Sequence, residues 1–196
     1  MKYINELVER YPQLTVCKEQ IAEATEKIIE MHKNSGKLLL CGNGGSCSDC
    51  EHISGELLKG FLLRRKPDST NEIISQLQDG IPAIPLASLT ALSTAFCNDV
   101  NPDLVYAQLV HVLHNSNDVF LGISTSGNSK NVVYGAMVAK EHNLVTIALT
   151  GGNDSKLGKI CDITIKVPES ETFKVQELHL PVYHAICAQV EEHFFK

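Results

Sequence analysis

The chain has 196 residues, a formal net charge of −6 at pH 7, 43% hydrophobic residues and 20% charged residues. This length and composition favour one globular domain over two. The acidic balance argues against nucleic acid as a partner, and no apolar run approaches the roughly 20 residues that span a bilayer. Seven cysteines, an odd number, and no secretion-signal pattern at residues 1–10 predict reduced thiols in the cytoplasm.

Short apolar segments alternate with helical patterns along most of the chain. Residues 1–35 form an N-terminal helical region, with a break expected near Tyr11-Pro12. Strands alternating with helices of ten or more residues predict a parallel sheet with helices on both faces. The expected strands are 37–41, 83–87, 119–123, 144–149 and 163–167, and the expected helices after residue 35 are 46–63, 88–97, 104–114, 131–142 and one of about two dozen residues from 171.

Residues 64–80 interrupt this alternation with a polar, irregular stretch that contains a short amphipathic piece at 72–77. We interpret it as an excursion from the core of a single domain covering 1–196. A lid and an oligomer contact are both open interpretations of this segment.

Two loops rich in glycine, serine and asparagine each follow an apolar strand. They are Gly42-Asn43-Gly44-Gly45-Ser46 and Ser124-Thr125-Ser126-Gly127-Asn128-Ser129. A strand that turns into a helix in this way leaves backbone N–H groups free, next to the positive end of the helix dipole. One such loop is explained by turn sterics alone, but two, the second made of hydroxyl and amide side chains, favour a site for a phosphate or another oxyanion.

His52 and Glu56 are four residues apart on the helix that starts at the first loop, so they share one face. Near a bound phosphosugar, this pair suits a general base or two ligands of a metal such as zinc. The alternative is an exposed pair on a solvated helix face.

The last helix carries Gln176, His179 and His184, with Pro181 among them. Gln176 and His184 are separated by about 80° around an ideal helix, so one pocket can contact both. His179 competes with His184 for this role. Spacing alone does not distinguish either one from a histidine buried in the core.

Two further features have alternatives of their own. Cys47 and Cys50 with His52 resemble half of a zinc site, but no second cysteine pair follows, which favours small buried thiols. Asn98-Asp99 caps a helix or reaches a sugar hydroxyl, and the sequence does not decide between them.

Together these motifs resemble the phosphoheptose isomerases, which are sedoheptulose 7-phosphate isomerases of the sugar isomerase (SIS) fold. The resemblance runs from about Ile21 to the C-terminus. It implies one flavodoxin-like SIS domain, a three-layer α/β/α sandwich with a five-stranded parallel sheet, assembled as a homotetramer with active sites at subunit interfaces. The residues that carry it are Gly42 to Ser46, His52, Glu56, Asn98-Asp99, Ser124 to Ser129, Thr150-Gly151, Gln176 and His184.

The resemblance also implies roles for individual residues. Glu56 would move a proton between C1 and C2 of the sugar through an enediol, with His184 as the partner acid. Some family members hold zinc, here implied on His52, Glu56, Gln176 and His184. The implied substrate-binding residues are Asn43, Gly44, Gly45, Ser46, Asn98, Asp99, Ser124, Thr125, Ser126, Ser129 and Gln176.

The implied reaction converts sedoheptulose 7-phosphate to D-glycero-D-manno-heptose 7-phosphate for surface polysaccharide, with a small phosphosugar as the partner and no membrane. Three departures concern substrate choice. Lys59-Gly60 stands where the family commonly has Gly-Arg, Phe173 stands where it often has an aspartate, and residues 64–80 form a longer segment than the family leads us to expect. The alternatives are a non-catalytic SIS module that binds a sugar phosphate or a protein, and an isomerase for another sugar phosphate.

Overall fold

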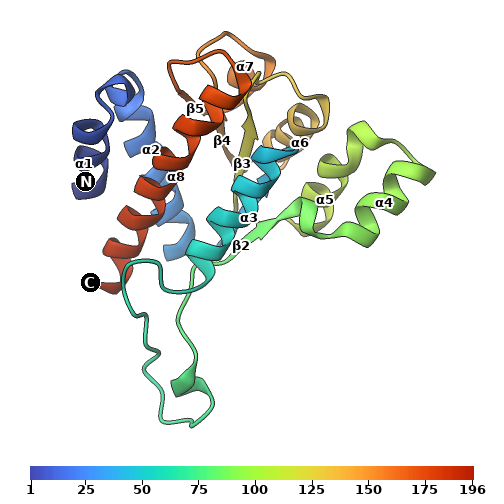
Figure 1. Cartoon of the computed structure of the whole chain (residues 1–196). Helices are drawn as coiled ribbons and strands as arrows, with labels where there is room; N and C mark the ends of the chain where they lie inside the picture. Colours follow the sequence, from blue (N-terminus) through green and yellow to red (C-terminus); the bar gives the residue numbers. More distant parts are fainter.

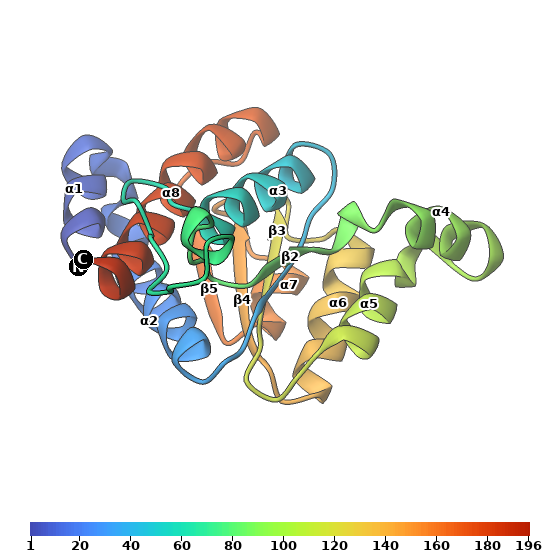
Figure 2. The same cartoon turned by 90° about the horizontal axis from the view of Figure 1, so that it is seen from below.

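The computed structural model describes all 196 residues. Its centre is a five-stranded sheet in the order β2-β1-β3-β4-β5, with every neighbouring pair parallel. Helices cover both faces of this sheet, which confirms the predicted three-layer architecture (Figure 1; Figure 2). The strands are β1 Leu38–Cys41, β2 Ala83–Pro85, β3 Val119–Ser124, β4 Val145–Thr150 and β5 Ile163–Lys166.

Side chains alternate along the strands and supply two separate cores. In β1, Leu38 and Leu40 belong to one apolar cluster, and Leu39 and Cys41 to the other. The first cluster packs under α1 Lys2–Arg10, η1 Pro12–Cys17, α2 Lys18–Lys33, α3 Gly45–Leu58 and α8 Thr172–Phe195. The second packs under α5 Val105–Leu113, α6 Lys130–Glu141 and α7 Lys156–Ile160.

The strand order places β1 beside β3, with Cys41 paired to Gly122. The chain leaves β1 toward β2 on one side, while β3 continues to β4 on the other, so the order reverses between these two strands. Such a switch point is where open α/β sheets bind ligands, at the carboxyl ends of the strands. The two glycine- and serine-containing loops follow these two strands and therefore meet at this point.

Two segments stand outside the layers. The region formed by η3 Leu86–Ser88, α4 Thr90–Asp99 and η4 Pro102–Leu104 projects from the sheet edge, and α4 has no buried residue (Figure 1). The excursion, with η2 Ile74–Gln76, hangs below the body and exposes 68% of Ile73 and 59% of Leu77. No helix combines the length and apolar character needed to cross a membrane.

Several expected boundaries were wrong. The helix after the first loop ends at Leu58, not at residue 63, because the N–H groups of Phe61 and Leu62 donate to the Glu191 carboxylate instead of to helix carbonyls. The second strand ends at Pro85 and turns into η3.

Two helical segments also differ from expectation. Asn98-Asp99 forms the last turn of α4, which ends at Asp99 and not at residue 97. The short helix α7 was not expected at all. Ser155 precedes its first residue, and the Ser155 hydroxyl accepts the N–H of Gly158 at 3.2 Å, a typical N-terminal cap.

Candidate active site

The first loop links β1 to α3 through Gly44, which has a φ of +56°. This left-handed conformation favours glycine. A side chain at Gly45 would meet the Gln176 Nε2 atom at 2.5 Å, so Gln176 of α8 lies directly against the first turn of α3. Ser46 is buried in that turn. The loop therefore joins backbone amides, a hydroxyl and the Gln176 amide in one place.

The second loop links β3 to α6 through Gly127, whose φ is +61° and whose missing side chain leaves room for Ser155. The hydroxyls of Ser124 and Ser129 are 3.1 Å apart, and Ser126 is exposed. Ser129 precedes the first residue of α6 but its side chain makes no capping bond. The loop thus presents several hydroxyl groups together with the N–H groups at the start of α6, and not all of these groups have hydrogen-bond partners within the protein.

A pair of asparagines joins the first loop to the first turn of α6. The Asn43 and Asn131 amides exchange hydrogen bonds of 2.9 Å in each direction. Tyr106 of α5 supports them from below by donating to the Gly42 carbonyl at 2.5 Å. Asn131 and Tyr106 were not among the expected site residues, because only the fold brings α5 and α6 to the first loop.

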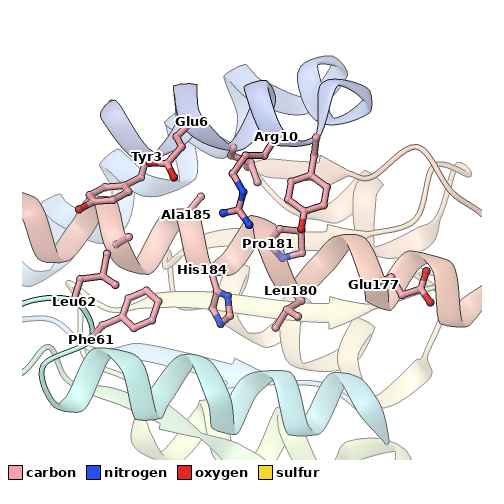
Figure 3. A pocket seen from close by; sticks show the side chains of 13 residues that line it. Tyr3, Glu6, Arg10, Phe61, Leu62, Glu177, Leu180, Pro181, His184 and Ala185 are labelled. Atoms are coloured by element: carbon pink, nitrogen blue, oxygen red, sulfur yellow. The ribbon is translucent and has the colours of Figure 1, made fainter.

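The titratable residues of the site lie where α3 faces α8. The Nε2 atom of His52 is 3.3 Å from Glu56 Oε1 and 3.3 Å from His184 Nε2. Figure 3 shows His184 leaving α8 and pointing toward α3. The structure therefore brings three of the expected residues, from two helices, into one cluster.

Tyr183 and Asp49 hold His52 from its other side. The Tyr183 hydroxyl is 3.0 Å from His52 Nδ1 and 3.2 Å from Asp49 Oδ1. Burial raises the pKa of the Asp49 carboxyl, although the Tyr183 hydroxyl and His52 oppose this. Sequence reasoning missed both residues; the only signal was their position, three residues before His52 and one before His184.

Burial lowers the pKa of the His184 imidazole, and the neighbouring His52 lowers it further, while Glu56 acts in the opposite direction. His184 is therefore neutral near pH 7. One side of its ring contacts Phe61, with ring centroids 5.5 Å apart. A cavity of about 380 Å³ between α1 and α8 reaches it from above, lined by Tyr3, Glu6, Arg10 and Leu180 among others (Figure 3).

Other expected residues lie elsewhere. His179 is fully buried, and neither ring nitrogen has a hydrogen-bond partner. Asn98 and Asp99 bond to each other at 2.8 Å on α4, which projects away from α3 and α8 in both views (Figure 1; Figure 2). Within a single chain these two residues are not part of the cluster.

Comparisons with known proteins show which family this chain resembles. The SIS domain family model matches residues 2–151. Phosphoheptose isomerase from Aneurinibacillus thermoaerophilus is 36% identical over 90% of this chain and 82% of its own length, and that from Helicobacter pylori strain P12 is 37% identical over 92% and 88%. The solved phosphoheptose isomerase of Neisseria gonorrhoeae superposes with a TM-score of 0.80 and 30% identity, covering 96% of this chain and 94% of that one.

The chain belongs to the phosphoheptose isomerase family of SIS-domain proteins. Membership confirms the family, fold and isomerase class that the sequence motifs predicted. The relatives are named as enzymes, which favours an isomerase over a non-catalytic SIS module. The phosphoheptose isomerase of Francisella tularensis, with a TM-score of 0.80 and 27% identity, covers 97% of this chain and 95% of that one.

Two pairs of donor atoms, in His52–His184 and in His52–Glu56, have the spacing of two ligands of one zinc ion. Two ligands of a tetrahedral zinc lie about 3.3 Å from each other when each bond is about 2.0 Å. The His52–His184 and His52–Glu56 separations of 3.3 Å equal this value. However, no group of three or more His, Cys, Asp or Glu side chains is placed to hold one ion, so a complete site requires some side-chain movement.

Proposed function

We propose that this protein is an aldose–ketose isomerase that converts sedoheptulose 7-phosphate to D-glycero-D-manno-heptose 7-phosphate through an enediol. The observation that carries the proposal is the convergence of Glu56 and His184 around His52, on helices that border the two-loop anion site. The names of the relatives support the phosphoheptose substrate.

Substrate binding begins at the phosphate. Backbone amides of both loops and the hydroxyls of Ser46, Ser124, Thr125, Ser126 and Ser129 suit its oxygens. Binding of the phosphate at the far end of the sugar fixes the reacting carbons in a defined orientation relative to the catalytic groups. Gly44 and Gly45 would allow the backbone to approach the ligand, and Gln176 of α8 lies directly against Gly45. Asn43 and Gln176 would then bind the sugar chain from the loop and from α8.

Proton transfer then uses the α3–α8 cluster. Glu56 takes the C1 proton of the ketose, the electrons form the enediol, and the proton returns at C2 to give the aldose. His184 donates its ring proton to the carbonyl oxygen and recovers one from the neighbouring hydroxyl. Its lowered pKa keeps the imidazole neutral, so it can donate and then accept a proton near pH 7.

We also propose a zinc ion on His52, Glu56, Gln176 and His184. When bound, zinc supplies a Lewis acid that polarises the carbonyl oxygen of the sugar. Metal analysis of the purified protein tests this, with His52→Ala and His184→Ala as variants on separate helices. Loss of zinc in both supports one shared site, whereas retention in either contradicts it.

The proposed assembly is a homotetramer in the cytoplasm, with active sites between subunits. Two observations support the assembly: α4 buries none of its residues, and the excursion exposes Ile73 and Leu77. A second copy that covers α4 would also bring Asn98 and Asp99 to a sugar. All seven cysteines are free, which supports a reducing compartment. Light scattering of the purified protein tests the tetramer.

The catalytic proposal is tested by incubating the protein with sedoheptulose 7-phosphate, with and without zinc, and following the products by NMR. Aldoheptose 7-phosphate is the expected product. Fructose 6-phosphate and ribulose 5-phosphate are the matched competitors. Faster turnover of either competitor points to another sugar-phosphate isomerase, and absence of turnover on all three contradicts an isomerase.

A further inference from the structure

Arg65 and Glu191 form an ion pair inside the protein, outside the cluster of proposed catalytic residues. Each is only 1% exposed, and Arg65 Nε donates to Glu191 Oε1 at 2.8 Å. Burying two charges is costly unless their remaining hydrogen-bonding groups are also satisfied. The hydrogen-bond partners of these remaining groups connect the ion pair to Glu56 and to His184.

The remaining nitrogens of Arg65 bind the end of α3. One donates to the Leu57 carbonyl at 2.5 Å and another to the Glu56 carbonyl at 2.9 Å. These are among the last carbonyls of the helix, which lack partners within it, and a cation is favourable at that end of the dipole. Arg65 therefore holds the backbone of the residue proposed as the base.

Glu191 binds the chain that follows α3. Its carboxylate accepts the N–H groups of Phe61 and Leu62, both at 2.7 Å, and that of Leu63 at 3.2 Å. Burial raises the pKa of Glu191, but these bonds and Arg65 outweigh it, so the net shift is downward and the group is an anion near pH 7. The segment held in this way places the Phe61 ring against His184.

We propose that Arg65 and Glu191 are positioning residues that set the separation between Glu56 and His184. Arg65 fixes Glu56 through its carbonyl, and Glu191 belongs to the same helix as His184, two turns further along. The pair clamps α3 to α8 at the catalytic end and supports His184 through Phe61. Neither residue touches the substrate, and the inference rests on the proposed isomerase function.

The decisive variant is Arg65→Lys, measured by steady-state kinetics well below its unfolding temperature. Lysine keeps a positive charge for Glu191, but its single nitrogen cannot also reach both α3 carbonyls. We expect kcat to fall about 10- to 100-fold, because a 1 Å misplacement of catalytic groups has effects of that size. KM should change less than about threefold, since the two phosphate loops are untouched. Glu191→Gln should show the same pattern.

Glu192→Gln is the matched control, because Glu192 is the next residue on α8 and pairs with Lys196 at the surface. It should leave kcat and KM unchanged. If Arg65→Lys lowers only thermal stability and keeps wild-type kcat while folded, the pair is structural and the inference is overturned. Should Glu191→Gln fail to fold, Arg65→Lys decides alone. An inactive wild-type protein contradicts the proposed function itself, a result distinct from unaffected variants of an active enzyme.

Discussion

Helices α3 and α4 both carry residues expected at the site, but they are held in different ways. Helix α3 buries Ser46, Cys50, Ile53, Ser54 and Leu57 against the sheet and α8, whereas α4 buries nothing. The position of Glu56 is thus fixed by the core of its own chain. Helix α4 contacts the second core through the half-buried Phe96, and Asn98 and Asp99 in its last turn are exposed. Proton transfer should therefore depend on residues of one chain. The contribution of α4 to substrate binding should depend on the protein surface that covers this helix.

Replacing the base tests the packed helix most strongly. Glu56→Gln keeps the shape of the side chain but removes the carboxylate, so kcat should fall by about 10³-fold, within the range for a lost general base. KM should change little, because the phosphate loops remain intact. Steady-state kinetics check both values. Wild-type turnover in this variant would show that α3 does not supply the base.

The buried His179 of α8 should make the stability of the protein depend on pH, whereas α4 has no buried residue that could do so. Burial lowers the pKa of His179 from 6.5 to about 4. The unfolded chain therefore binds more protons between these values, so this stabilisation is complete above pH 6.5 and is lost as the pH falls toward 4. The loss amounts to about 3 kcal/mol.

Urea unfolding of wild type and His179→Gln at pH 7 and pH 5 measures this effect. The wild type should lose more stability than the variant on acidification. An equal loss in both would mean that another group governs the acid side.

The second loop allows a smaller test. Gly127→Ala forces a side chain into a left-handed backbone position and into Ser155. We expect KM to rise about tenfold, equal to about 1.4 kcal/mol of lost phosphate binding, with a smaller change in kcat. Gly55→Ala is the control, since nothing lies within 4 Å of the added methyl group, and it should be neutral or slightly stabilising. Equal KM values in both variants would remove the second loop from the phosphate site.

The smallest effect is expected on α4. Asp99→Asn should raise KM by less than about fivefold, the loss of one charge-assisted hydrogen bond to a sugar hydroxyl, and should leave the unfolding temperature unchanged. Thermal denaturation and kinetics at several protein concentrations check this. A marked loss of stability would show that α4 is packed in the working enzyme through Asp99 itself.

The sequence predicted the elements that depend on local pattern. The strand and helix alternation, both loops, and His52 with Glu56 on one face follow from spacing along the chain. The end of α3 could not be predicted, because Glu191, 130 residues after Phe61, takes up the amides that follow the helix. Nor could spacing choose between His179 and His184, since only the packing of α8 on α3 directs one ring inward and the other to His52. Tyr183 and Asp49 were missed for the same reason.

The central claim is that Glu56 moves a proton between C1 and C2 of a phosphosugar, and exchange with solvent measures that step directly. Sedoheptulose 7-phosphate incubated with the enzyme in D₂O should gain deuterium at C1, and the aldose formed should carry it at C2. Glu56→Gln should slow both incorporations about 10³-fold while binding of the sugar phosphate persists. Deuterium incorporation or aldose formation at the wild-type rate in Glu56→Gln would contradict the account.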